Sequence, residues 1–263
     1  KGETVKMSQL DKTFCEGFVT YLANAMTIGF EIPKRGQHHQ KKLAKGTARL
    51  YFNSFVTALN EAVREGIISE NPNRLLKKEE KKLVCKNDSN RPHLNIEEIK
   101  TLIRTPCKNA AVKKAFLFAC FCGLRVSDIK TLKWSDIRKE TDGICISKKM
   151  IKTKQVVTIP LSENALAWMP SKGNAKLDDL VFCLPSYFTI NYQIKQCAKE
   201  AGLEKNITFH VARHTFATAL LTMGADLYTT SKLLGHQNIK TTQVYAEVVN
   251  KKKVETVNLL DKI

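Results

Sequence analysis

The chain has 263 residues, of which 43% are hydrophobic and 26% are charged, and this composition is typical of folded proteins, not of disordered ones. Its 43 lysines and arginines against 25 acidic residues give a formal net charge of +18, which favours a polyanionic partner such as nucleic acid. No apolar run approaches the roughly 20 residues that cross a bilayer, and the first residues contain no signal-peptide core. We therefore expect a cytoplasmic protein that binds nucleic acid and not a membrane.

The eight cysteines include no CxxC pair, so the spacing typical of zinc ligands is absent. Cys120 and Cys122 are the one close pair, and they lie in an apolar segment. This pattern predicts small buried hydrophobic side chains in a reducing compartment.

Residues 1–80 are predicted to form a helical domain. Apolar side chains recur at helical spacing from Phe14 to Leu22 and again from Phe52 to Val63, and Gly66 is a good C-terminal stop. The connector between these helices is basic and contains no acid from residue 34 to residue 49. Such a stretch is often only a solvated face, but the global charge favours contacts to phosphate. The residues assigned to these contacts are Lys41, Lys42, Lys45 and Arg49.

Residues 77–92 are charged and polar and end in Pro92, which predicts an exposed linker, with the boundary segment placed at 81–92. A second domain, 93–263, begins at a capping box formed by Asn95 and Glu98. It is predicted to be helical except for the β-branched runs 144–146 and 155–159, which flank a lysine-rich turn. The expected fold is mainly α, with a small antiparallel β-sheet in the second of two domains.

Four short segments carry chemistry: residues 122–128, the turn around 152–154, residues 210–215, and residues 234–245. Together they offer cations and a phenol. The sequence contains no Gly-rich phosphate loop, no GxSxG serine and no carboxylate cluster suited to magnesium. Arginine forks bind phosphate oxygens in a bidentate way, and a cage of cations stabilises the charge that develops when a phosphodiester is attacked. We therefore expect phosphoryl transfer without a metal or cofactor.

His210 and Arg213 are three residues apart, so they project from one face of a helix towards a common target. His214 is turned by roughly 100° from Arg213 around that helix. It is therefore predicted to be a packing or capping histidine.

The segments GLRVSD, HVARHTFAT and LLGHQNIKTTQVY resemble the motifs of the tyrosine recombinases, the integrases of phages and mobile elements. The resemblance implies that two arginines bind the scissile phosphate, that one histidine transfers a proton and another donates to the phosphate, and that an aspartate supports the site. It also implies a tyrosine nucleophile that forms a 3′-phosphotyrosine. In that order, the residues are Arg125 and Arg213, His210, His236, Asp128 and Tyr245.

The resemblance further implies a lysine in the hairpin turn that protonates the departing 5′ oxygen. Counting back from the segment 159–161 favours Lys152, while Lys154, two residues away, is the alternative.

The same resemblance implies that residues 1–80 are a core-binding domain, which clamps double-stranded DNA together with the catalytic domain in the bacterial cytoplasm or nucleoid. It implies a homo-oligomer, with a dimer on each core site and a tetramer in synapsis. The need for an accessory DNA-bending factor stays open. Integrases of this kind often carry an arm-type DNA-binding domain upstream, and its absence here fits a truncated chain.

Residues 251–263 are expected to form a terminal helix with one apolar stripe. The stripe consists of Val254, Val257, Leu259, Leu260 and Ile263. Two alternatives are open: the helix packs on its own catalytic domain, or, as in many relatives, it reaches into a neighbouring protomer.

Two other functions are compatible with parts of this pattern. A type IB topoisomerase shares the chemistry but reseals the same strand, and it lacks the H-x-x-R arrangement. A non-catalytic DNA-binding module would explain charge and fold, but not the presence of all the polar site residues.

Overall fold

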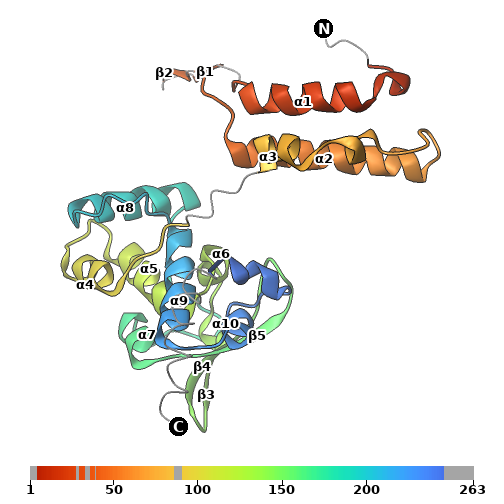
Figure 1. The fold of residues 1–263 in the computed structure, drawn as a ribbon. Coiled ribbons are helices and arrows are strands. Elements are labelled where there is room, and N and C mark those ends of the chain that lie inside the picture. Colours follow the sequence, from red (N-terminus) through yellow and green to blue (C-terminus); the bar gives the residue numbers. More distant parts are fainter. Residues whose placement is uncertain (1–4, 28–29, 33–35, 39, 86–90, 246–263) are drawn as a thin grey trace, which may run out of the picture. The chain divides into compact units, whose positions relative to one another are not determined.

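The computed structural model describes residues 5–27, 30–32, 36–38, 40–85 and 91–245 (Figure 1). The chain divides into two compact units, Lys1–Ser89 and Asn90–Ile263. Among the described residues, no helix is both long and apolar enough to cross a membrane.

The first unit is helical. Its elements are η1 (Met7–Gln9), α1 (Lys12–Asn24), β1 (Phe30–Ile32), β2 (Gly36–His38), α2 (Lys45–Arg64), η2 (Pro72–Leu75) and α3 (Lys78–Cys85). Helix α1 begins where the Asp11 side chain accepts a hydrogen bond from the backbone of Phe14. Its buried face packs against α2, where the rings of Phe18 and Phe55 lie 4.7 Å apart. The strands β1 and β2 form a two-stranded antiparallel hairpin that the sequence pattern did not indicate.

The expected linker differs from the structure at its beginning. Residues 78–85 form helix α3, and Val84 is buried in the core of the first unit together with α1 and α2. The segment KEEKKLVC contains few apolar residues, so its composition resembles that of a linker although one side of the helix is packed.

The second unit is built around two largely buried helices, residues 110–122 and 209–223. Its elements are α4 (Ile96–Arg104), α5 (Ala110–Cys122), α6 (Val126–Lys130), η3 (Trp134–Asp136), β3 (Ile137–Glu140), β4 (Gly143–Lys149), β5 (Val156–Pro160), α7 (Glu163–Trp168), α8 (Tyr187–Glu200), α9 (Phe209–Met223), α10 (Leu227–Leu233), η4 (Ile239–Thr241) and η5 (Gln243–Tyr245). Helix α5 is apolar and almost entirely buried after Lys114, where α7, α8 and α9 cover it. The predicted capping box at Asn95 and Glu98 is present at the start of α4.

The sheet has the order β3-β4-β5, and both pairs are antiparallel. Ile146 pairs with Ile159, and both are fully buried, which fixes the register of the hairpin. The turn between β4 and β5 closes through a hydrogen bond from the Met150 amide to the Gln155 carbonyl. The predicted fold class, mainly α with a small antiparallel sheet, is confirmed.

The cysteines correct one expectation. Cys15, Cys120, Cys122 and Cys145 are buried free thiols, as the sequence indicates. Cys107 and Cys197 instead form a disulfide, which joins the loop before α5 to helix α8.

Candidate active site

The turn after α5 places the first arginine. Gly123 ends α5 with a φ of +71°, in the left-handed region, and Arg125 is the N-cap residue of α6. The Arg125 side chain is half-buried, and its Nη1 atom is buried without a hydrogen-bond partner among the described residues. A buried donor without an acceptor is costly, so this atom favours an anion bound at the turn.

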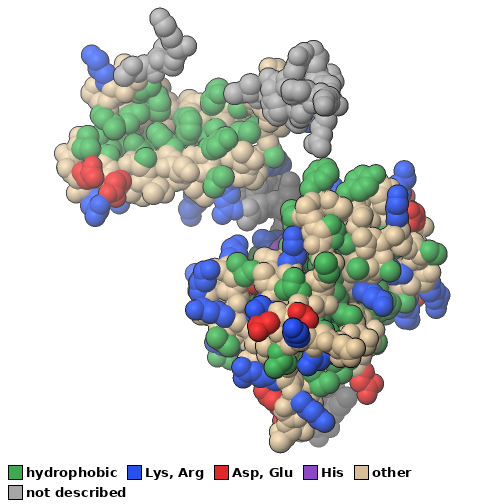
Figure 2. All heavy atoms as spheres, turned by 180° about the vertical axis from the view of Figure 1, so that it is seen from behind, with side chains coloured by type: hydrophobic (Ala, Val, Ile, Leu, Met, Phe, Trp, Pro, Cys, Tyr) green, Lys and Arg blue, Asp and Glu red, His purple; other side chains and the backbone are tan. Residues whose placement is uncertain are grey.

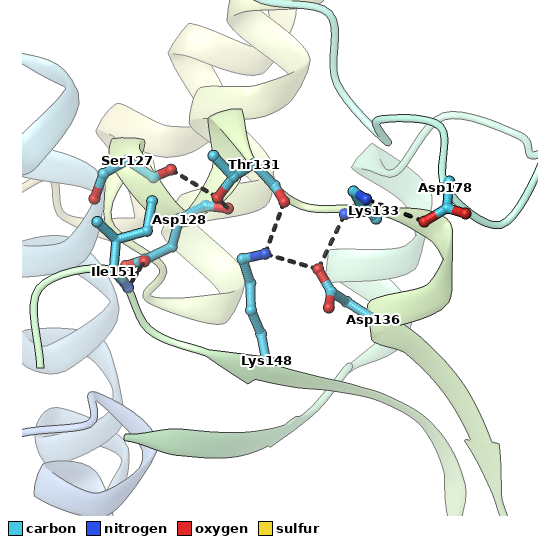
Figure 3. Close-up of polar contacts among 8 residues, drawn as sticks. All are labelled: Ser127, Asp128, Thr131, Lys133, Asp136, Lys148, Ile151 and Asp178. Atoms are coloured by element: carbon cyan, nitrogen blue, oxygen red, sulfur yellow. Dashed lines mark hydrogen bonds and ion pairs between the residues drawn. The ribbon is translucent and has the colours of Figure 1, made fainter. Parts of the chain in front are cut away.

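Asp128 connects this turn to the hairpin. It is fully buried, and its Oδ1 atom accepts a hydrogen bond of 2.8 Å from the backbone amide of Ile151 (Figure 3). Burial lowers the pKa of the Arg125 guanidinium, and the negative charge of Asp128 raises this pKa again. Asp128 therefore ties the hairpin to this turn and supports the charge of the arginine.

Lys148 is a second anchor of the hairpin, and it was not singled out in the sequence. Its Nζ atom donates to the Thr131 carbonyl and to Oδ2 of Asp136, at 2.7 Å each (Figure 3). In β4 it shares a face with Ile144 and Ile146, so the alternation of buried residues was the signal that could have found it.

The two candidate lysines of the turn, Lys152 and Lys154, are both exposed. Lys154 adopts a φ of +59°. The positive charge of Lys152 contributes to lowering the pKa of His210, which places Lys152 within electrostatic reach of helix α9. The turn is also tied to the segment after α10, since the Gln237 amide donates to the Thr153 carbonyl at 3.2 Å.

Arg213 joins three segments that are distant in the sequence. Its side chain is 3% exposed, with Nη1 donating to the Gly123 carbonyl at 2.8 Å and Nη2 to the Leu234 carbonyl. Burial, followed by the charge of Arg125, lowers the pKa of Arg213 to about 9, so the guanidinium stays protonated at neutral pH.

His236 lies in the turn after α10, where its Nδ1 atom shares a 2.7 Å hydrogen bond with Oγ1 of the buried Thr242. Burial, followed by the charges of Arg213 and Arg125, lowers the pKa of His236 to about 4. The ring is therefore neutral at pH 7, and its other nitrogen remains for a ligand.

Tyr245 ends the last described element, η5. Its ring is 7% exposed and packs in an apolar cluster with Phe216 and Leu234. Burial raises the pKa of the Tyr245 phenol, while the charges of Arg213 and Arg91 oppose this shift.

His214 is not only a packing residue, and the sequence-based interpretation is corrected here. Its Nδ1 atom lies 2.5 Å from the Tyr245 hydroxyl oxygen, and its ring meets that of His210 edge-on at 4.6 Å. Burial, followed by the charge of His210, lowers the pKa of His214 to about 3, so the imidazole is neutral at pH 7.

Arg91 was also missed. It lies in the segment interpreted as a linker, yet its charge contributes to lowering the pKa of three site histidines, His210, His214 and His236. Nothing in its local sequence distinguishes it from the other basic residues there.

The arrangement is thus a set of cations around a buried phenol. Partial burial and then the charges of Arg213, Arg125, Arg91 and Lys152 lower the pKa of His210, so these four cations act on one point. Lysine and arginine side chains are also widespread on the face of the second unit in Figure 2. Such a site can bind a phosphodiester and stabilise the extra negative charge of its transition state. Among the described residues, no cluster of histidine, cysteine and acidic side chains has the geometry of a metal site.

The basic residues predicted to bind DNA in the first unit lie around the start of α2. Lys42, Lys45 and Arg49 line a hollow of about 840 Å³ beside the end of α1. Lys41 is exposed next to it, and its backbone pairs with Thr27.

Comparison with known proteins identifies the class. Residues 92–252 match the phage integrase family, and residues 1–83 match the phage integrase SAM-like domain. The chain belongs to the phage integrase family, the tyrosine recombinases.

Two relatives illustrate the range. The chain is 34% identical over 179 residues to "Tyrosine recombinase XerD" of Proteus mirabilis, a match that covers 60% of this chain and 56% of the relative. It is 31% identical over 229 residues to "Tyrosine recombinase XerC" of Bacillus pumilus, and this match covers 78% of this chain and 72% of the relative. The chain thus spans little more than half the length of the first of these relatives.

Solved structures show the same fold. A lambda integrase dimer bound to a COC′ core site matches with a TM-score of 0.68 and 19% identity, covering 93% of this chain and 82% of that chain. XerH recombinase bound to palindromic difH substrate, in a post-cleavage complex, matches with a TM-score of 0.67 and 18% identity, covering 97% and 74%.

Proposed function

We propose that this chain is a site-specific DNA recombinase that cuts and rejoins DNA through a 3′-phosphotyrosine at Tyr245. The observation that carries the proposal is the buried Nη1 atom of Arg125. This donor has no acceptor among the described residues, and it lies in a group of cations that would attract an anion. A non-bridging phosphate oxygen is the acceptor that suits a guanidinium best.

The proposed reaction is a pair of transesterifications. The Tyr245 hydroxyl gives its proton to a neighbouring imidazole and its oxygen forms a bond to phosphorus, while the bond from phosphorus to the 5′ oxygen breaks and the departing oxygen takes a proton from Lys152. Arg125, Arg213 and His236 stabilise the extra charge on the phosphate oxygens. A 5′-hydroxyl from a second duplex then gives its proton to Lys152 and attacks the phosphotyrosine, and the released phenol oxygen takes back a proton from the imidazolium. The bond energy is kept in the covalent intermediate, so that rejoining needs no ATP.

Tyrosine substitution tests the nucleophile. Tyr245→Phe removes the attacking oxygen and should abolish covalent attachment to a nicked suicide substrate, while DNA affinity changes less than a few fold, because affinity comes mainly from phosphate contacts. Tyr228→Phe is the matched control, since Tyr228 is 60% exposed on α10 and should react normally. An adduct that survives in Tyr245→Phe would refute the assignment.

The same assay separates the alternatives. A binding module gives no adduct with the intact chain, a topoisomerase relaxes supercoiled DNA without exchange, and a recombinase exchanges strands between two sites. Chelators should leave the cleavage rate unchanged, because arginine and lysine side chains supply the positive charge in this mechanism.

We further propose that the helical first unit, predicted as residues 1–80, is a core-binding domain that clamps double-stranded DNA together with the catalytic domain, predicted as 93–263. The lambda integrase dimer on a core site supports a dimer on each site here, and strand exchange then needs a tetramer.

The predicted tail helix, 251–263, lies outside the described residues. Val257→Asp with Leu260→Asp should abolish cooperative occupancy of two half-sites in a gel shift but leave binding to one half-site. Unchanged cooperativity would mean that the tail packs on its own domain.

A further inference from the structure

The hydroxyl group of Tyr245 has one hydrogen bond among the described residues, and its partner is His214. The Nδ1 atom of His214 lies 2.5 Å from the phenol oxygen, on a helix 31 residues earlier in the chain. Each of the two side chains is 7% exposed. The contact is therefore a buried pair of nucleophile and imidazole, the arrangement that activates nucleophiles in many enzymes.

A buried phenol needs a proton acceptor within reach. The ordinary pKa of tyrosine is about 10, and burial raises the pKa of Tyr245 further. The ring is enclosed by Phe216, Leu234 and their apolar neighbours, so its proton has little access to bulk water. Attack on phosphorus must release that proton, and a base in direct contact can take it as the new bond forms.

His214 is in the right state to accept the proton. Burial and its charged neighbours keep the imidazole neutral. These neighbours are His210 and Arg213 on the same helix, together with Arg91 and His93 from the segment before α4. In the tautomer with its proton on Nε2, Nδ1 presents a lone pair to the phenol. The ring of His210 packs edge-on against this imidazole, with the ring centroids 4.6 Å apart. A phosphodiester bound to the arginines brings negative charge, which favours protonation of His214 during the reaction.

On this basis we infer that His214 accepts the phenolic proton of Tyr245 when the nucleophile attacks, a role that rests on the proposed recombinase function. As the bond from the Tyr245 oxygen to phosphorus forms, the hydroxyl proton passes to Nδ1 of His214. The 5′ oxygen leaves with a proton from Lys152. In the rejoining step the imidazolium returns its proton to the departing phenol oxygen. The resemblance gave proton transfer to His210, but the phenol oxygen contacts His214, and His210 packs beside it under the charge of the four cations.

The experiment compares His214→Ala, His214→Asn and His210→Ala in single-turnover cleavage of a nicked suicide substrate. Loss of a general base should slow adduct formation by about 10²–10⁴-fold in His214→Ala, with DNA binding in gel shifts unchanged within a few fold. His214→Asn guards against misfolding, because its amide oxygen can take the place of Nδ1 as a hydrogen-bond acceptor without being a base. It should remain as slow as the alanine variant.

The decisive arm replaces Tyr245 by a fluorinated tyrosine with a lower phenol pKa. A phenol that ionises readily does not need a base, so this replacement should restore most of the rate in the His214 variants and little of it in His210→Ala. Rescue confined to His210→Ala, wild-type cleavage by His214→Ala, or full activity of His214→Asn would each overturn the inference.

The proposed function can be judged separately. If the wild-type chain forms no adduct at Tyr245, the recombinase function fails and the inference falls with it. If the adduct forms at Tyr245 and is indifferent to His214, only the inference fails.

Discussion

Gly123 is the position where one added methyl group should do most damage to both stability and site geometry. An alanine there would hold a φ near +71°, which costs an L-residue about 1–2 kcal/mol. Its Cβ would lie 2.4 and 2.8 Å from two ring atoms of Phe216 and 3.2 Å from the Leu234 side chain. Forcing an extra carbon into a packed core costs about 1–3 kcal/mol. Together these effects predict a loss of about 2–5 kcal/mol for Gly123→Ala, a large share of the 5–15 kcal/mol typical of a whole domain.

Gly202→Ala is the matched control. Gly202 has a φ of +70°, but nothing lies within 4 Å of the added Cβ, so only the backbone cost of about 1–2 kcal/mol applies. Urea unfolding followed by tryptophan fluorescence reports on the second unit alone, because both tryptophans, Trp134 and Trp168, belong to it. Equal losses for the two variants would refute the packing argument. Because Phe216 packs beside Tyr245, Gly123→Ala should also slow cleavage, while Gly202→Ala should not.

Three further predictions concern the hairpin and the buried histidine. Lys148→Ala removes the donor of the Thr131 carbonyl and one of two donors of Asp136, which keeps its hydrogen bond from the Lys133 amide. The substitution should cost about 1–3 kcal/mol of stability in the same unfolding assay, and a loss below about 0.5 kcal/mol would contradict it. Lys152→Ala should cut normal DNA slowly but recover on a substrate with sulfur at the 5′ bridging position, because a thiolate leaves without a proton. If Lys154→Ala shows this rescue instead, the general acid is Lys154. Finally, the folded-state pKa of His214 is about 3 against an unfolded value of about 6.5, so the stability tied to its neutral form is complete above pH 6.5 and declines as the pH falls towards 3. Relative to His214→Asn, wild-type stability should decrease by about 1 kcal/mol between pH 6 and 5, and parallel stability curves would contradict this.

Local patterns predicted most of the fold because they act over a few residues. The capping box at Asn95 and Glu98 and the β-branched runs that form the hairpin of β4 and β5 express backbone chemistry that sequence spacing reveals. Helix α3 was not predicted, because a helix that buries little more than Val84 needs few apolar residues and therefore has a weak sequence pattern. The disulfide between Cys107 and Cys197 was not predicted, because a contact between residues 90 apart in the chain leaves no local sequence pattern.

In the candidate site, the sequence motifs identify the main residues, but they do not identify the contacts of those residues. The motifs named Arg125, Arg213 and Tyr245 as one group, and the structure brings their charges into mutual reach. The partners of these groups depend on tertiary contacts. That Arg213 donates to two main-chain carbonyls, or that Arg91 acts on the histidines, follows only from the folded chain.

His214 shows where a closer use of helix geometry would have helped. Measured from Arg213, it is turned by roughly 100° around the helix, and that angle suggested a residue facing away from the site. Measured from His210, however, it is four residues on and therefore on the same face, one turn along, as the edge-on ring contact at 4.6 Å shows. The helix thus presents two histidines in a row along one face, with Arg213 beside them. Periodicity alone predicts that the two histidines are neighbours, but it does not predict that the His214 ring contacts the phenol of Tyr245, 31 residues later in the chain. Burial makes the phenol harder to ionise and the imidazole harder to protonate. In the proposed mechanism, the negative charge of a phosphodiester bound by Arg125 and Arg213 stabilises the protonated imidazole, so that substrate binding raises the basicity of His214 beside the nucleophile.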